Sequence, residues 1–290
     1  MSKKHHHSGP RPAPESLGLP PTGVDSHAHL DLKHFGGDFE TVLERAKAAG
    51  IARIGNVFLS PEAWAAGKDR FPTSPAVPDV FFLLGIHPTD SAAWTPSTAD
   101  ALRQAFTSDP RLRALGEIGL DYYWKDCPPE LQRSVFIAQL KLAESLRRST
   151  PNSKATDRLP IVIHSRDAFQ DTLVLLREQG FSGYPLLWHC FGGTAREAEL
   201  LIEEGWHISI PGPVTFPGNA ALREALHAIP PSRLLLETDC PYLTPVPYRG
   251  TRNEPAYTVF TAHAVAAELR MDPAELWTLT GNNACRFFGL

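Results

Sequence analysis

The sequence has little that would tie it to a membrane, to an oxidising compartment or to broad wrapping of nucleic acid. It holds four cysteines (Cys127, Cys190, Cys240 and Cys285), none in a CxxC pair, so we expect free thiols in a reducing compartment. No stretch approaches the roughly 18 to 20 continuous apolar residues of a membrane span, and no signal-peptide pattern is present. The net charge of −4 argues against broad electrostatic binding of nucleic acid. We therefore expect a cytoplasmic protein with no membrane partner and no obligate protein partner.

Two segments lack a periodic apolar pattern. Residues 1–22 are polar and rich in proline, and they include His5, His6 and His7. We expect this segment to be a disordered lead whose histidine run, native or tag-derived, holds no organised metal site. Residues 149–158 form a polar loop inserted before the fifth predicted strand. The rest of residues 23–290 is expected to be one domain.

From residue 23 onward, short β-branched segments alternate with longer segments of helical period. The eight predicted strands are residues 24–32, 51–58, 80–87, 112–120, 160–165, 184–190, 206–212 and 233–239. The last helix is predicted to begin with Asp272, Pro273 and Glu275, a capping-box start. Eight such repeats in 290 residues predict a single (β/α)8 TIM barrel. A doubly wound open sheet is the alternative, but it usually has fewer strands, and no glycine-rich phosphate loop follows the first predicted strand.

Polar side chains interrupt the predicted strands near one end. His27 and His29 stand two residues apart, so they project from the same face of a strand, toward the barrel mouth where TIM-barrel active sites lie. Glu117 lies inside an apolar segment, where an unpaired carboxylate would be costly. The full set is His27, His29, Glu117, His164, His189 and Asp239. Four imidazoles and two carboxylates are the donors expected for two divalent ions, with Mg²⁺, Mn²⁺ and Zn²⁺ all open.

The charge of such a centre favours an anionic substrate. Neutral histidines and two carboxylates contribute about −2 against about +4 from two divalent ions, which leaves a positive cavity in a mildly acidic protein. Two ions about 3.5 to 4 Å apart are also the arrangement that supports in-line phosphodiester hydrolysis. The site can therefore grip nucleic acid locally even though the whole chain is acidic.

Three neighbours of these residues have structural interpretations as well. Cys190 and Cys240 each follow a proposed ligand directly, so strand alternation should turn both thiols to the opposite face. Glu237 shares the face of Asp239, two residues later. It either orients a ligand or forms a salt bridge deeper in the barrel.

Eight motifs together resemble those of the TatD-type metal-dependent deoxyribonucleases, which belong to the amidohydrolase-like barrels. In chain order they are DSHAHLD, GIHP, GEIGLDYY, PIVIHSRDA, WHCFGG, SIPGPVTF, LLLETDCPYLTP and RNEP. The resemblance runs from about residue 23 to residue 290 and leaves out the lead and the 149–158 insertion.

The resemblance implies roles for the six polar residues. His27 and His29 would bind one metal ion, and Glu117 would bridge to a second ion held by His164 and His189. Asp239 would be a ligand of the first ion and the general base for the attacking water. All six positions carry the family's residue types, so an active enzyme is expected.

Four more residues stand in motifs that line the substrate side of this family. The resemblance assigns phosphate contacts to His87 and Arg252, and base stacking to Tyr123. The alternative is that Asp121 and Tyr123 only shape the loop after the fourth strand, and that Arg252 belongs to a helix start.

The resemblance implies a 3′–5′ exodeoxyribonuclease acting on single-stranded DNA through a water activated by two metal ions. RNA and aminoacyl-tRNA stay open as substrates, because the same centre could serve a deacylase or another amidohydrolase. A metal-stabilised scaffold without turnover is a third hypothesis. Many amidohydrolase barrels bridge their metals with a carbamylated lysine on the fourth strand, and the segment ALGEIGL has no lysine. This difference argues against phosphotriesterase-like chemistry.

Overall fold

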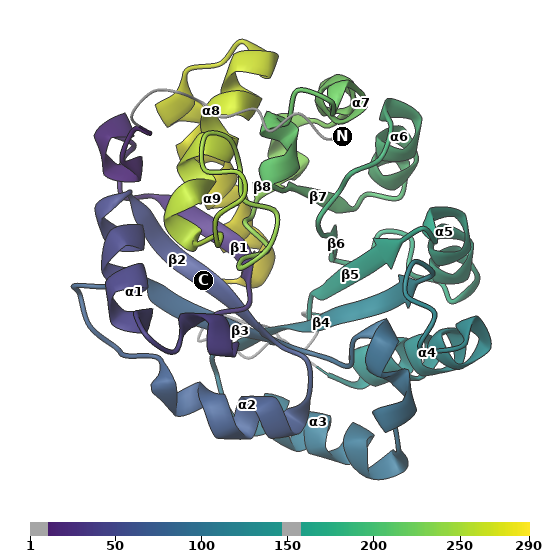
Figure 1. Cartoon of the computed structure of the whole chain (residues 1–290). Helices are drawn as coiled ribbons and strands as arrows, with labels where there is room; N and C mark the ends of the chain where they lie inside the picture. Colours follow the sequence, from purple (N-terminus) through teal and green to yellow (C-terminus); the bar gives the residue numbers. More distant parts are fainter. Residues whose placement is uncertain (1–10, 147–157) are drawn as a thin grey trace.

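A computed structural model describes residues 11–146 and 158–290, and it shows a barrel of parallel strands surrounded by helices (Figure 1). The eight strands pair in chain order, each with the next. They are β1 (Gly23–Ala28), β2 (Ile51–Phe58), β3 (Asp79–Leu84), β4 (Leu112–Asp121), β5 (Ile161–Arg166), β6 (Leu186–Trp188), β7 (His207–Ile210) and β8 (Leu234–Leu236). The predicted TIM barrel is confirmed.

The barrel closes between its first strand and the residues that follow its last. The Asp239 N–H donates to the His27 carbonyl at 2.9 Å, and the His29 N–H donates to the Cys240 carbonyl at 2.9 Å. Two backbone hydrogen bonds at the mouth therefore join segments that lie more than two hundred positions apart in the chain. Three of the four residues involved are predicted site residues, so closure of the barrel and assembly of the site are one event.

A helix follows each strand, and a ninth closes the chain. They are α1 (Phe39–Ala48), α2 (Pro61–Gly67), α3 (Pro96–Ser108), α4 (Pro129–Ser145), α5 (Phe169–Glu178), α6 (Ala195–Glu203), α7 (Ala220–Ala225), α8 (Thr258–Leu269) and α9 (Pro273–Phe288). Asp272 caps α9 by accepting hydrogen bonds from the N–H groups of Ala274 and Glu275. The N-cap and Pro273 agree with the predicted start, and Asp272 satisfies N–H groups that have no partner inside the helix. Of the predicted capping box only the Asp272 half is formed, because Glu275 returns no hydrogen bond to the Asp272 N–H.

Apolar side chains form two layers on either side of the strands. The larger layer packs the outer face of the barrel against the helices. The smaller one fills the barrel interior at its amino-terminal end and includes Val24, Phe81, Leu83, Phe287 and Phe288. The last two come from α9, so this helix plugs the end of the barrel opposite the mouth. The interior is a packed core, as in other TIM barrels.

The expectation of a disordered lead is wrong for residues 11–22. Pro14–Leu17 form a 3₁₀ turn with Pro14 buried, and Leu17 and Leu19 pack against the outer core. The Trp277 indole N–H donates to the Pro20 carbonyl at 2.8 Å. These contacts bury apolar surface that the sequence pattern did not reveal, because the anchoring partners lie near the other end of the chain. The histidine run lies outside the described residues, as does the 149–158 insertion apart from Arg158.

No helix among the described residues is long and apolar enough to cross a membrane.

Candidate metal centre

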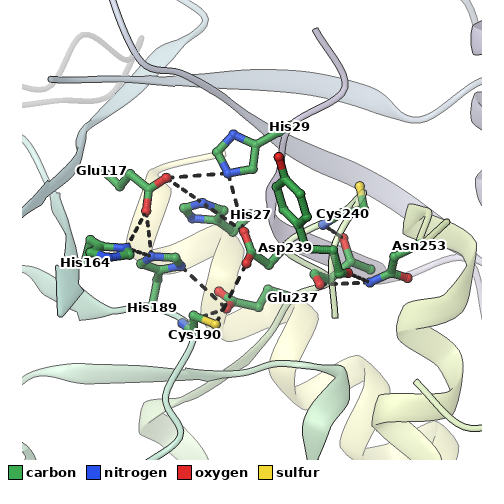
Figure 2. Close-up of polar contacts among 12 residues, drawn as sticks. His27, His29, Glu117, His164, His189, Cys190, Glu237, Asp239, Cys240 and Asn253 are labelled. Carbon is green, nitrogen blue, oxygen red and sulfur yellow. Dashed lines mark hydrogen bonds and ion pairs between the residues drawn. The ribbon is translucent and has the colours of Figure 1, made fainter. Parts of the chain in front are cut away.

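The six predicted ligands converge at the mouth of the barrel (Figure 2). His27 lies in β1, Glu117 in β4 and His164 in β5. His29, His189 and Asp239 lie one to three residues beyond the strands that precede them. The predicted strands 24–32, 184–190 and 233–239 are therefore longer than the observed ones. Regular pairing ends where the backbone turns to point these side chains into the site.

Simple strand alternation brings three of the six side chains inward. Val162, Leu187 and Leu235 face the barrel interior. His164 and His189 follow the first two by two residues, and Asp239 follows Leu235 by four, so all three lie on the interior side. In β1 and β4 regular alternation would turn the predicted ligands outward. Val24 and Ala114 face the interior, and His27 and Glu117 each follow three residues later, an odd separation that would place them on the opposite face.

Irregularities in the strand register explain why His27, His29 and Glu117 nevertheless point inward. The pairing of β1 with β2 shifts between Asp25 and Ala28, and that of β4 with β5 shifts between Leu115 and Ile118. An extra residue in one strand reverses the face on which the later side chains appear. His27, His29 and Glu117 therefore reach the interior through local breaks in the ladder.

Glu117 lies between two groups of donors, one on each carboxylate oxygen. Its Oε1 is 3.5 Å from His29 Nε2 and 3.7 Å from His27 Nε2. Its Oε2 is 2.7 Å from His189 Nε2 and 3.1 Å from His164 Nδ1. Figure 2 shows the carboxylate directed between the two histidine pairs. A carboxylate in this position can share one oxygen with each of two cations.

Asp239 completes the first group, with Oδ1 at 3.4 Å from His29 Nε2 and 3.9 Å from His27 Nε2. The ligand atoms of His27, His29 and Asp239 all lie within 4.8 Å of one another, as do those of Glu117, His164 and His189. His27 is fully buried, and neither of its ring nitrogens has a hydrogen-bond partner among the described residues. A buried imidazole without a partner is costly. A bound cation would remove that cost, so the residues present fit a metal site.

The two carboxylates of the site are held in the ionised form that binds cations. Burial opposes ionisation of Glu117, but the charges of His189 and His27 outweigh it and hold the pKa of Glu117 well below its ordinary value. Burial likewise opposes ionisation of Asp239, and His29 beside it keeps the pKa of Asp239 low. Burial lowers the pKa of His27, whereas for His29, His164 and His189 the neighbouring carboxylates outweigh burial and raise the pKa, so a bound cation would displace protons from those three rings. Ionised carboxylates and neutral imidazoles are the forms that bind metals.

Two further carboxylates lie beside the outer nitrogens of His164 and His189. Asp121 Oδ2 lies 2.9 Å from His164 Nε2, on the far side of that ring from Glu117. Glu237 Oε1 lies 3.6 Å from His189 Nδ1, and Glu237 also accepts hydrogen bonds from the Ser209 hydroxyl and the Cys190 N–H. A carboxylate on the outer nitrogen sets the tautomer and the direction of a ligating imidazole. Glu237 lies at ion-pair distance from His189 without a hydrogen bond to Nδ1, so both interpretations of Glu237, ligand orientation and salt bridge, stay predictions.

The two cysteines beside predicted ligands differ. Cys240 is buried in the outer core, as strand alternation predicts. The prediction for Cys190 is wrong, since its Sγ lies 4.0 Å from Asp239 Oδ2 at the edge of the site. Cys190 has φ of 49°, and this left-handed backbone beyond the end of β6 interrupts the alternation.

Asp25 belongs to the support of the site, and our sequence reasoning missed it. It is fully buried and accepts hydrogen bonds from the Thr238 hydroxyl at 2.6 Å and the Thr238 N–H at 2.9 Å. Burial raises the pKa of Asp25 to about 8, although the hydrogen bonds from Thr238 favour the ionised form. Its place two residues before His27, in DSHAH, was the available signal.

The predicted substrate residues lie in different environments. His87 packs edge-on against His164, with ring centroids 4.4 Å apart, and burial lowers the pKa of His87 to about 3. Tyr123 is about half exposed. Arg252 forms two hydrogen bonds with Asp38, both 2.7 Å long, and a third with the His34 carbonyl. The structure thus brings His87 to the predicted metal ligands and places Arg252 in an ion pair outside them.

Comparisons with known proteins agree with this geometry. The chain matches the family model described as TatD related DNase over residues 24–289. YabD of Bacillus subtilis, named an uncharacterized metal-dependent hydrolase, is 35% identical over 271 residues that cover 91% of this chain and 98% of YabD. TatD of Salmonella typhimurium, named a 3′-5′ ssDNA/RNA exonuclease, is 33% identical over 270 residues, with coverage of 91% and 98%.

A solved structure supports the same assignment. The crystal structure of YjjV, a TatD homologue from Escherichia coli K12, matches with a TM-score of 0.80 at 27% identity, and the match covers 93% of this chain and 98% of YjjV. Family match, relatives and fold all agree with the metal-ligand pattern at the barrel mouth. This chain therefore belongs to the TatD family of metal-dependent hydrolases.

Proposed function

We propose that this hydrolase cleaves phosphodiester bonds of DNA as a 3′–5′ exodeoxyribonuclease on single strands, with two divalent ions in its centre. The observation that carries the proposal is the position of Glu117, whose two oxygens face two separate donor groups. His27, His29 and Asp239 would hold one ion, His164 and His189 the other, and Glu117 would bridge them. The name of the Salmonella relative supports the choice of bond and polarity.

When bound, such ions lower the pKa of a coordinated water and neutralise phosphoryl charge. The protein supplies the rest. Asp239 is the most exposed of the six side chains, at 17%, and its pKa is held below the ordinary value, so it is ionised and reachable at neutral pH. It would accept a proton from the attacking water and pass it to the departing 3′ oxygen as the P–O bond breaks. A base within reach of both atoms is what this step requires.

His87 would act next to this reaction as a neutral group. Because its pKa is about 3, the ring carries no charge at neutral pH and can donate one hydrogen bond to a phosphate oxygen. Its Nδ1 lies 2.6 Å from the Thr89 hydroxyl, which leaves Nε2 for the substrate. Tyr123 would stack on a base. Arg252 would contact phosphate only by exchanging Asp38 for it, which makes it the weaker assignment.

The direct test is hydrolysis of single-stranded DNA labelled at either end. Metal-stripped protein is assayed alone and after addition of Mg²⁺, Mn²⁺ or Zn²⁺. We expect shortening from the 3′ end only, and only with metal, and no cleavage by a folded His164→Ala variant. If the protein binds metal but no ion restores cleavage, DNA is not the substrate. Hydrolysis of an aminoacyl ester under the same conditions would then replace the proposal with the deacylase alternative.

A further inference from the structure

The large apolar side chains that remain exposed are confined to one end of the molecule. Among the described residues they are Tyr123, Trp124, Leu131, Tyr242 and Leu243. The first three follow β4, and the last two follow β8. Both strands point their carboxyl ends toward the mouth, so all five side chains lie on the rim around the metal centre. Elsewhere on the described surface, residues of this size are at least partly covered.

These residues form two groups on opposite sides of the mouth. The strands pair in the order β1 to β8 around the barrel, so β4 and β8 are four positions apart and face each other across it. We define the β4 platform as Tyr123, Trp124 and Arg166, and the β8 platform as His34, Tyr242 and Leu243. Glu117 comes from β4 and Asp239 follows β8, which places the metal centre between the platforms.

The β4 platform combines ring faces with an arginine, and an exposed lysine precedes His34 of the β8 platform in the sequence. The Arg166 guanidinium lies over the Tyr123 ring, 3.8 Å from its centroid, and Trp124 packs edge-on against Tyr123 at 5.0 Å. On the other side, the His34 ring meets Tyr242 edge-on at 6.3 Å, and Lys33 beside it is exposed. Exposed rings interleaved with arginine and lysine are the surface that binds unpaired bases and their phosphates. A purely apolar patch would suit a protein partner better.

Both platforms are tied to site residues through the backbone. Asp121, which contacts His164, also accepts hydrogen bonds from the N–H groups of Tyr123 at 2.9 Å and Trp124 at 3.1 Å. The Tyr242 N–H donates to the Asp239 carbonyl at 3.0 Å. The backbone that carries the rings is therefore held at a fixed position relative to the catalytic groups, which reduces the entropy lost when a ligand binds.

We propose that the two platforms hold the unstacked bases on either side of the scissile phosphate, so that a DNA single strand crosses the mouth from one platform to the other. This proposal rests on the proposed nuclease function and adds the recognition that selects single strands. In duplex DNA the faces of each base are covered by the neighbouring base pairs, so a duplex could not place its bases on the platforms. Because every base offers a ring face, the grip is tolerant of sequence.

The test combines ring-removing variants with strands that lack a base. Trp124→Ala and Tyr242→Ala are each expected to raise KM for a normal strand about tenfold, the effect of losing one stacked base, while kcat changes less than about twofold. Trp124→Phe should keep most of the affinity. Leu131→Ala, which removes an exposed side chain of the same rim without a ring, is the matched control and should leave KM unchanged.

The same variants are then compared on strands with an abasic position flanking the scissile bond. If Trp124 or Tyr242 stacks on that base, its alanine variant loses nothing further on the abasic strand. A merely structural role would instead weaken binding of both strands equally. Binding of strands blocked by phosphorothioate linkages gives a second readout that does not depend on turnover, and Kd should follow the same pattern.

The outcomes separate the two proposals. Wild-type protein that cleaves DNA while Trp124→Ala and Tyr242→Ala leave KM and Kd unchanged overturns the platform proposal alone. Wild-type protein that cleaves no strand with any metal overturns the nuclease function, and the platform proposal falls with it. Tenfold losses that disappear on abasic strands support both.

Discussion

The two ends of the barrel are built from the same strands but hold opposite kinds of side chain. At the amino-terminal end, Val24, Phe81 and Leu83 pack with Phe287 and Phe288 in a closed apolar interior. At the mouth, a few residues further along, the interior holds four imidazoles and several carboxylates with little solvent contact. Apolar burial at the amino-terminal end therefore stabilises the fold. Burial of polar and charged groups at the mouth costs folding free energy but holds those groups at fixed positions.

This contrast shows that the residues for catalysis and the residues that stabilise the fold lie at different ends of the barrel. Changes at the mouth should alter metal binding and turnover far more than folding, and changes at the plugged end should do the reverse. Four experiments test that division.

Glu117→Gln should have the largest effect. The substitution preserves shape but removes the negative charge between the two donor groups. We expect kcat to fall at least about a thousandfold, equivalent to about 4 kcal/mol of lost transition-state stabilisation. The melting temperature should stay close to that of metal-free wild type, measured by circular dichroism. Substantial remaining activity in a folded variant would show that Glu117 does not hold the metals.

Phe288→Ala tests the opposite end. The side chain is fully buried and contacts the rings of Phe81 and Phe287, with centroids 4.7 and 4.9 Å away. The resulting cavity should lower the free energy of unfolding by about 3 to 5 kcal/mol, measured by urea denaturation. The kcat of the folded fraction should remain within about twofold of wild type. Phe288→Leu, which leaves a smaller cavity, should lose less, and a large loss of kcat would contradict the division.

Glu237→Gln tests the support beneath the ligands. Removing the charge beside His189 Nδ1 should weaken metal binding about 10- to 100-fold, measured by calorimetric titration of the metal-stripped protein. Glu204→Gln, which alters a carboxylate paired with Arg177 on the surface, is the control and should bind metal normally. Equal affinities for the Glu237 variant and wild type would mean that His189 needs no orienting partner.

His207→Gln should have the smallest effect, at the amino-terminal end. Burial and the nearby Arg233 and Arg286 lower the pKa of His207 to about 4, below its ordinary value of 6.5. The unfolded chain therefore binds this proton first as the pH falls, so wild type loses stability between pH 6.5 and 4. The variant should lose less, by at most about 1.4 kcal/mol per pH unit, the effect of one proton. Urea denaturation at several pH values measures this, and parallel curves would contradict it.

Much of the fold and of the site could be predicted from single residues and their spacing. The eight strands and the helix start at Asp272 follow from patterns within short segments, where local propensity and tertiary structure agree. The six candidate ligands could be predicted because each places a polar group in, or directly after, an apolar strand. Burying such a group costs free energy, so its presence in an apolar strand indicates a functional role.

Other features depended on contacts between distant segments. The order of residues 11–22 comes from Trp277 and the outer core, and the position of Cys190 comes from a left-handed residue beyond β6. Arg252 stands in a family motif, yet its guanidinium is bound by Asp38. None of these partners can be identified from the residues themselves, because the fold alone decides which side chains meet.

The sequence by itself determined the barrel, its donors and their chemical type, since hydrophobic period and the cost of buried polar groups are properties of the chain. Only the tertiary structure decided how those donors face one another. Register shifts in β1 and β4 turn His27, His29 and Glu117 inward, and closure of the barrel brings Asp239 to His29. A strand's side chains alternate by local geometry, but where that alternation is interrupted depends on the neighbouring strand with which it pairs.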